Sequence, residues 1–195
     1  MHTTKLMHLD KTYVDLNELV FFNQPICEYG NTGFSTAPHL HIGVIKGHYK
    51  DFTMLGIENG QFQSDEKKLY DLVNNTLMNG AYRVTTRYLE SGYKEMYGQG
   101  LYEHWGLDLV SLVGTRNVKW SSHSIGKVVN KGYNSTAGNF LVIQFNDDIT
   151  GHWAEDVIKK MIETGRMRGY PDGTFQPDKP ITRAEYAMSE INKKL

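Results

Sequence analysis

Two histidines stand one residue apart in "GNTGFSTAPHLHIGV", the segment that spans residues 30–44. Side chains two positions apart on an extended strand point to the same face of its sheet. His39 and His41 are therefore expected to project together from one strand. Imidazoles bind metal ions and transfer protons near neutral pH, but this pair by itself is not yet a site.

A second segment, "YEHWGLDLV", contributes His104 and Asp108, four positions apart. Gly106 between them disfavours a helix, so we expect the pair on a loop that runs into a strand. Neutral imidazole and carboxylate groups both suit zinc. Catalytic zinc usually takes three protein ligands and leaves a fourth position for water, so His41 alone is two ligands short.

The composition favours a turn-rich β protein. The 195 residues suffice for one medium domain with a small appendage, and 19 glycines against 5 prolines suit many short strands. The formal net charge of −1, without a basic stripe, argues against nucleic acid as a partner. The single cysteine, Cys27, excludes an internal disulfide and a zinc site built from cysteines.

Most of the chain carries strand signals. Short apolar and β-branched runs bounded by turn formers fill residues 5–44 and 82–147, and they predict strands. Between these regions, residues 65–77 carry leucines and a valine at helical spacing. This spacing predicts an amphipathic helix that links the two β regions.

The pattern changes after "FNDDITG". Apolar residues at helical spacing predict a helix over residues 153–162. A second helix is expected to begin near Thr182, which can form a capping box with Glu185. The segment "GYPDGTFQPDKP" between the two helices is dense in turn formers and predicts a loop. The sequence thus predicts a mainly β domain followed by a small helix–loop–helix module.

At this point the chain resembles a known family. "HWGLDL", followed by "GKVV" and "GNFLVIQF", resembles the first half of a lysostaphin-type zinc endopeptidase domain, which cuts peptide bonds in peptidoglycan. "MHLDKTYVDLNELV…GNTGFSTAPHLHIGV" resembles the second half. The resemblance implies one Zn²⁺ per chain, bound by His104, Asp108 and His41. It also implies that His39 and His8 form the catalytic pair.

The two halves stand in the reverse of the family's order. Residues 1–50 and 82–148 together make about one domain, with each motif present once. The simplest interpretation is a circularly permuted, antiparallel, lysostaphin-like peptidase domain over residues 1–148, in which residues 51–81 are the new linker. Two alternatives remain open, a remnant of two tandem domains and an exchange of halves between two chains.

The permutation makes a geometric prediction. Strand 5–12 should lie beside strand 139–146, since the family joins these two strands by a tight connection. The linker over residues 45–81 should wrap across the outside of the domain without entering the site.

Each histidine motif by itself has a structural interpretation, because paired strand histidines commonly sit at the edge of a core. The matching contexts "GNTG-x-S-T-x-P-H-L-H" and "H-W-G-L-D" make chance a poor explanation of both together. The alternative function is a non-catalytic wall-binding or activator protein with a relic metallopeptidase fold. Relics of this kind usually lose metal ligands, whereas this chain keeps all of them.

The N-terminal residues lack a basic start followed by an apolar run, so we expect no secretory signal, and no segment approaches a membrane-spanning length. We therefore expect a protein made in the host cytoplasm that has no membrane partner and reaches the wall after release. With the resemblance, this fits a phage endolysin, and a virion-borne enzyme is the alternative. The resemblance favours a D-Ala–diaminopimelate bond as the target over a glycine bridge.

Residues 149–195 resemble one S-layer homology motif, with "GYPDGTF" and "ITRAE" as its specific parts. The resemblance implies binding to a secondary cell-wall polysaccharide, with Arg183, Trp153 and Tyr170 as candidate contacts. Trp153 could instead fill the small core, which the sequence favours, and the whole segment could be a packing appendage. A unit this small is marginal alone, so we expect a homotrimer through residues 150–195.

Overall fold

The computed structural model describes residues 1–47, 66–74, 81–87, 104 and 106–191, which are called the described residues below. Its strands are β1 (His2–Thr12), β2 (Leu19–Val20), β3 (Pro25–Tyr29), β4 (Leu40–Lys46), β5 (Tyr82–Thr86), β6 (Leu107–Ser111), β7 (Asn117–Lys119), β8 (Gly126–Asn134) and β9 (Gly138–Phe145). Its helices are α1 (Glu66–Asn74), α3 (Glu155–Glu163) and α4 (Arg183–Ile191). Within the described residues, no helix combines the length and apolarity needed to cross a membrane.

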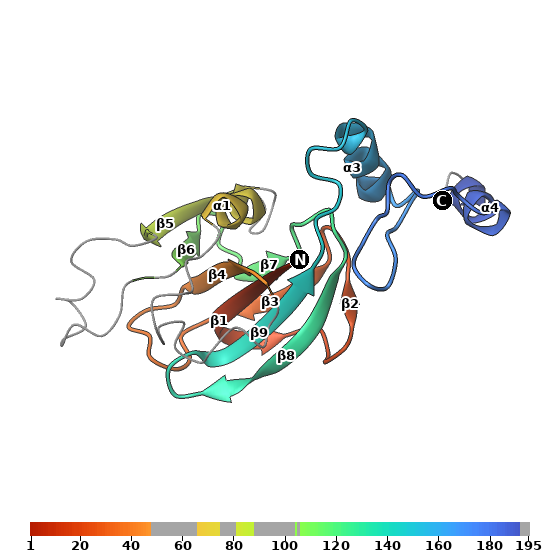
Figure 1. The fold of residues 1–195 in the computed structure, drawn as a ribbon. Coiled ribbons are helices and arrows are strands. Elements are labelled where there is room, and N and C mark those ends of the chain that lie inside the picture. The colour runs from red at the N-terminus through yellow and green to blue at the C-terminus, as the bar shows by residue number, and fades with distance from the viewer. Residues whose placement is uncertain (48–65, 75–80, 88–103, 105, 192–195) are drawn as a thin grey trace.

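The strands form one antiparallel sheet of nine strands, which confirms the predicted mainly β class. Its main path runs β2-β8-β9-β1-β4-β6-β5, and β3 pairs with β1 and β7 beside that path (Figure 1). The strand β4 shows how the sequence makes a half-buried strand. Leu40, Ile42 and Val44 alternate along it and are fully buried in the core, whereas His41 between them projects from the opposite face.

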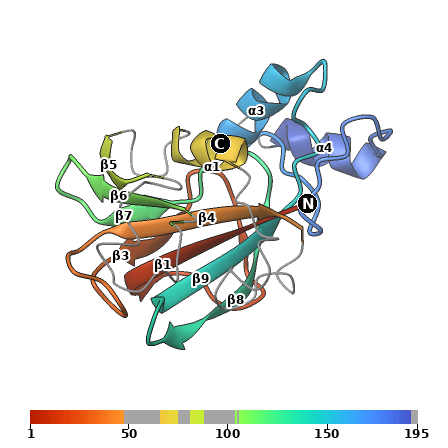
Figure 2. The same ribbon diagram turned by 60° about the vertical axis from the view of Figure 1, so that its left-hand side comes forward.

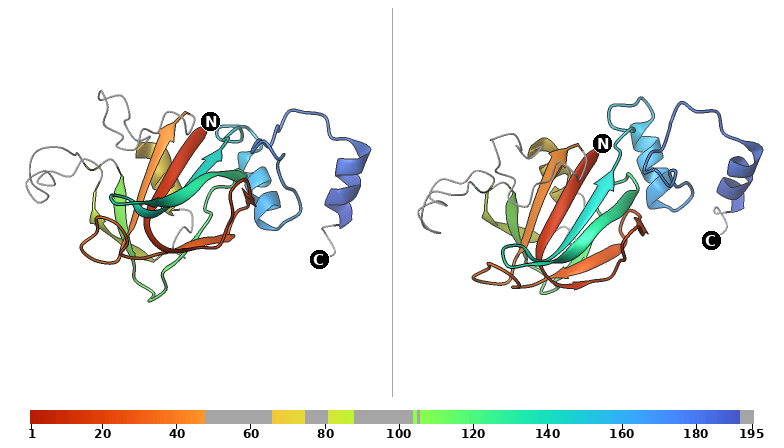
Figure 3. Two further views of the ribbon diagram at one scale, coloured as in Figure 1. Left: turned by 90° about the horizontal axis from the view of Figure 1, so that it is seen from below. Right: turned by 60° about the horizontal axis from the view of Figure 1, so that its bottom comes forward.

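The central strand β1 pairs on one side with β9 and on the other with β4 (Figure 3). Its first residue, His2, lies opposite Phe145 at the end of β9. The predicted pairing of strand 5–12 with strand 139–146 is therefore confirmed. The start of β1 therefore lies beside the end of β9.

The helix α1 belongs to the core. Leu69, Leu72 and Val73 are buried in the same hydrophobic cluster as the sheet, and Lys68 forms an ion pair with Asp147 beyond β9. The predicted amphipathic helix is confirmed, and its apolar stripe is buried against the sheet. It contributes no residue to the cluster of His41, His104 and Asp108. The rest of the predicted linker, residues 51–65 and 75–80, lies outside the described residues.

The helical module follows β9 directly. Figures 1 and 2 show α3 beside one end of the sheet, and in Figure 1 α4 lies beyond α3. The predicted capping box is confirmed at the start of α4. Thr182 donates its backbone N–H to Glu185 Oε2 at 2.7 Å, and Glu185 donates its own N–H to Thr182 Oγ1 at 3.2 Å.

The module is fastened to the sheet by hydrogen bonds around its loop. The Asp148 carboxylate accepts the backbone N–H groups of Phe175 and Gln176, at 2.9 Å and 2.6 Å. Asn146 donates to the backbone carbonyl of Asp172 at 2.9 Å. The loop that carries "GYPDGTF" is thus held against the end of β9.

We predict that Leu69→Ala lowers the free energy of unfolding by about 3 kcal/mol, because it removes a fully buried side chain from the shared core. Urea unfolding followed by circular dichroism measures the change. Lys67→Ala on the exposed side of α1 is the matched control and should change stability by less than about 0.5 kcal/mol. Equal stabilities of both variants would show that α1 does not contribute to the core.

Candidate metal centre

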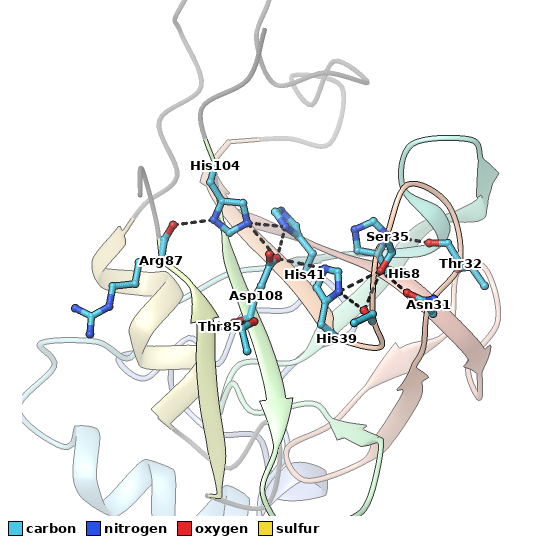
Figure 4. A network of polar contacts seen from close by, with 11 residues as sticks. His8, Asn31, Thr32, Ser35, His39, His41, Thr85, Arg87, His104 and Asp108 are labelled. Atoms are coloured by element: carbon cyan, nitrogen blue, oxygen red, sulfur yellow. Dashed lines mark hydrogen bonds and ion pairs between the residues drawn. The ribbon is translucent and has the colours of Figure 1, made fainter. Parts of the chain in front are cut away.

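Three predicted site residues converge on one point: His41, His104 and Asp108 (Figure 4). His41 Nδ1 lies 2.9 Å from Asp108 Oδ1, and His104 Nε2 lies 3.0 Å from the same oxygen. The two ring nitrogens are 3.1 Å apart. These are the three residues that the resemblance assigned to zinc.

The sheet brings these residues together from distant parts of the sequence. His41 on β4 and Asp108 on β6 are directly opposite each other in the antiparallel register. Residues directly opposite in such a pair have neighbouring side chains on one face. His104 lies just before β6 and is only 2% exposed, so its ring closes the third side of the cluster.

A backbone carbonyl fixes the tautomer of His104. Its Nδ1 lies 2.7 Å from the carbonyl oxygen of Arg87, which can only accept a hydrogen bond. The proton of the neutral ring is therefore on Nδ1, and the lone pair of Nε2 faces Asp108 Oδ1. Two electron-rich atoms in contact favour a cation between them, either a metal ion or a proton.

Gly106 lets the His41 ring lie against β6. A Cβ at this position would stand 2.5 Å from the carbonyl oxygen of Ile42 and 2.6 Å from His41 Nε2. Contacts this short are incompatible with any side chain at position 106. The glycine in "HWGLD" is therefore needed for the close approach of the two strands at the cluster.

His39 borders the cluster. Its Nε2 is 3.5 Å from Asp108 Oδ1, while its Nδ1 donates to the carbonyl oxygen of Ala37 at 2.8 Å. The Ser35 hydroxyl lies 3.2 Å from the same Nδ1 and also donates to Asn31. The lone pair of Nε2 is thus directed toward the cluster.

His8 completes the set from β1. It adopts a left-handed backbone conformation with φ of 61°, at a bulge in the pairing of β1 with β9. This conformation is uncommon for a residue other than glycine, and a bulge can re-aim a side chain. The His8 ring lies 4.7 Å from that of His39, and its Nδ1 donates to the carbonyl oxygen of Thr32 at 2.9 Å.

Burial and mutual contact set the charges of the cluster. Burial lowers the pKa of His41 to about 4, despite the opposing effect of the Asp108 carboxylate. Burial by itself raises the pKa of Asp108, but its contacts with the rings of His104 and His41 outweigh burial and hold that pKa below its usual range. Near pH 7 the site therefore presents a neutral His41 and a carboxylate, the forms that bind metal.

The donor set fits zinc. Ligands about 2.0–2.2 Å from a tetrahedral zinc ion stand roughly 3.3–3.5 Å apart, close to the separations of 2.9, 3.0 and 3.1 Å in this cluster. Two imidazoles and one carboxylate also match the usual composition of catalytic zinc sites. His41, His104 and Asp108 are the residues that would hold the ion.

The three predicted wall contacts lie in the helical module. Trp153 is 90% exposed, so the expectation that it fills the small core is wrong: the short helices leave no enclosed space for it. Tyr170 donates its hydroxyl to Glu185 at 2.8 Å, which ties the loop to α4. Arg183 begins α4 and is exposed.

Sequence reasoning missed the groups that orient the histidines. The carbonyl oxygens of Thr32, Ala37 and Arg87 are backbone atoms, so no residue type could have indicated them. Ser35 had a signal, since it lies four positions before His39 in the quoted motif.

Comparison with known families matches residues 147–187 to the S-layer homology domain. This segment is an S-layer homology domain. Over 53 residues the chain is 51% identical to a cellulosome-anchoring protein of Acetivibrio thermocellus. The aligned segment covers 27% of this chain and 12% of that protein. Over 44 residues it is 46% identical to an S-layer protein of Bacillus licheniformis, covering 23% and 5%. The chain therefore spans only a small part of each relative, and no solved structure matches it.

We predict that metal-free protein loses stability as the pH falls from about 6.5 toward 4. The pKa of His41 is about 4 in the folded chain and about 6.5 when unfolded, so acidification favours proton uptake by the unfolded state. This one group is expected to cost up to about 3 kcal/mol. Urea unfolding in chelator at pH 7, 6 and 5 measures it, with His41→Asn as the comparison. An equally steep decline in that variant would exclude His41 as the cause.

Proposed function

We propose that this chain is a zinc-dependent endopeptidase that cleaves peptide bonds of bacterial peptidoglycan. The observation that carries the proposal is the triangle of His41, His104 and Asp108, bordered by the imidazoles of His39 and His8. The sequence resemblance to lysostaphin-type peptidases supplies the reaction class, and it agrees with the residues that meet.

A zinc ion in this triangle would lower the pKa of a water ligand to about 7 and polarise the scissile carbonyl. The chain's own residues would move the protons. His39 is the nearer base, since its Nε2 lone pair points at the cluster while Nδ1 is held by Ala37. His8 lies beside His39 and suits the delivery of that proton to the departing amine: burial lowers its pKa, so it is neutral near pH 7 and readily gives up a proton that it receives.

The S-layer homology domain is proposed to hold the enzyme on its substrate. Proteins matched over this segment include a cellulosome-anchoring protein and S-layer proteins, which supports attachment to the cell surface. We propose a secondary cell-wall polysaccharide as the ligand. The exposed Arg183 and Trp153 offer a cation and an aromatic face to such a polymer, and Tyr170 holds the loop between them.

The proposed target is the D-Ala–diaminopimelate cross-link, and the proposed role is that of a phage endolysin that meets the wall after release. Both rest on the resemblance of the two modules to wall-active proteins. Mass spectrometry of digested walls identifies the bond, since each cleavage leaves a characteristic new amine. Fragments with newly freed glycine amines would replace this assignment with a glycine bridge.

Alanine at His41, His104 or Asp108 is expected to abolish zinc binding and wall lysis together, because two ligands rarely hold a catalytic metal. His39→Ala should keep about one zinc per chain and reduce lysis by roughly 100-fold or more, the usual worth of a positioned base. Elemental analysis and turbidity of cell-wall suspensions measure the two effects.

His152→Ala is the matched control, since His152 pairs with Asp178 in the helical module. It should match the wild type in both assays. A wild-type protein that lyses walls without metal, or a His39→Ala protein with full activity, would contradict the mechanism. A wild-type protein that is metal-free and inactive would favour the non-catalytic relic.

We also propose the homotrimer, built on the helical module. None of the side chains of α4 is buried, and the module exposes a set of large apolar side chains: Trp153, Val157, Ile181, Tyr186, Met188 and Ile191. Such a set on a small module indicates a surface covered by another chain. Three copies would also give three wall contacts per particle and raise the avidity of weak single sites.

Light scattering on the full chain is expected to give a trimer mass at micromolar concentration. Met188→Glu should shift the mass toward the monomer, because it places a charge in the proposed contact. Lys127→Glu, an exposed change on β8, is the control and should leave the trimer intact. A monomeric wild type would exclude the trimer.

A further inference from the structure

The sheet face that carries the metal cluster continues beyond it along β1. Met7 on β1 is directly opposite His41 on β4, so the two side chains share that face. Lys5 lies two positions before Met7 and therefore projects from the same face. On its other side, Lys5 is opposite Val142 of β9, and on β4 it is opposite Gly43, which has no side chain.

The ammonium group of Lys5 is close enough to act on a peptide bound at the cluster. Two residues along a strand span about 7 Å, and neighbouring strands lie about 5 Å apart. A lysine stem adds several ångströms of adjustable reach. Its Nζ lies over Phe140 on β9, which is on the far side of β1 from β4. Two strand spacings of about 5 Å each separate Phe140 from His41, so the span from the cluster to Lys5 Nζ corresponds to roughly three residues of an extended peptide, at about 3.4 Å per residue.

Lys5 carries a cation that the described residues leave without a counter-ion. It is half-buried, its Nζ lies 4.9 Å from the centroid of the Phe140 ring, and it forms no ion pair with any described carboxylate. Burial lowers its pKa, which shows that the ammonium has lost part of its hydration. By contrast, Lys68, Lys131 and Lys159 each pair with an aspartate or glutamate.

A desolvated cation without a counter-ion is costly in a protein that only needs to fold. A substrate that supplies an anion would offset the free-energy cost of this unpaired ammonium when it binds. The aromatic face of Phe140 keeps the ammonium in place without neutralising it, as a cation–π contact does. The surroundings of Lys5 are thus suited to a single negative group delivered by a ligand.

We propose that Lys5 binds a carboxylate of the peptide substrate, at a distance of roughly three extended residues from the bond that is cut. This inference rests on the proposed peptidase function and adds its substrate class: peptides that carry a free carboxylate near the scissile bond. The carboxylate belongs either to a side chain, as in a diaminopimelate residue, or to the C-terminal residue of the stem peptide.

The test compares synthetic cross-linked peptides in three forms: both carboxylates free, only the side-chain carboxylate amidated, and only the C-terminal carboxylate amidated. Zinc-loaded wild-type chain should cleave the free form with a kcat/KM roughly 10- to 100-fold above one of the amidated forms, the usual worth of a charge-assisted hydrogen bond. The form that loses activity identifies the source of the carboxylate.

Lys5→Met should reduce kcat/KM for the free peptide by the same factor and leave the sensitive amidated peptide unchanged. Lys5→Arg should restore most of the preference, because the positive charge returns. Lys127→Met removes an exposed cation on β8 and should behave as the wild type. Zinc content and the unfolding midpoint of each variant establish that its site and fold are intact.

Equal cleavage of all three peptides by the wild type would overturn the role of Lys5 and leave the peptidase function standing. This arm needs no variant, so it holds even if Lys5→Met fails to fold. A preference that survives in a folded, zinc-loaded Lys5→Met protein would also overturn it. No cleavage of any peptide, together with no lysis of walls, would overturn both proposals.

Discussion

The position of β1 between β4 and β9 is the constraint on which the rest of the structure depends. β4 carries His41 and pairs with β6, which carries Asp108, while β9 leads directly into the S-layer homology domain. β1 joins the pair of β4 and β6, which brings the two distant segments of the cluster together, to β9 and β8. The same strand supplies His8 at its bulge and Lys5 three positions earlier. Backbone pairing thus positions both the cluster of His41, His104 and Asp108 and the surface beside it.

Burial gives the cluster its chemistry. His104 and Asp108 are almost inaccessible to water, and a buried carboxylate is tolerated only when its neighbours satisfy it. Here His41 Nδ1 lies within hydrogen-bonding distance of the Asp108 carboxylate, whereas the carbonyl of Arg87 accepts the Nδ1 proton of His104, so that the lone pair of His104 Nε2 faces the same carboxylate. An inward-facing lone pair beside a carboxylate is a poor arrangement for a protein core and a good one for a cation. The burial and the arrangement of these donors therefore support the proposed metal centre.

Much of this arrangement could be predicted from the sequence, because it depends on residue types at fixed spacing. The alternation in β4 and the capping box of Thr182 with Glu185 follow from such patterns. The identity of the clustered residues was implied by the resemblance to lysostaphin-type peptidases. The role of α1 could not be predicted, since an amphipathic stripe does not name its partner. The left-handed His8 and the carbonyl groups that hold the histidines depend on the tertiary path of the backbone, which leaves no pattern in residue type. The prediction that Trp153 fills the core of the helical module was wrong, because so small a module cannot enclose so large a ring.

The central claim is that two separated segments of one chain form a single zinc site. Crystals of the zinc-loaded full chain, measured on both sides of the zinc absorption edge, test it most directly. The account predicts one anomalous peak per chain, about 2.0–2.2 Å from His41 Nδ1, His104 Nε2 and a carboxylate oxygen of Asp108. A map without a peak at this triangle, or a zinc ion whose ligands come from two different chains, would contradict it.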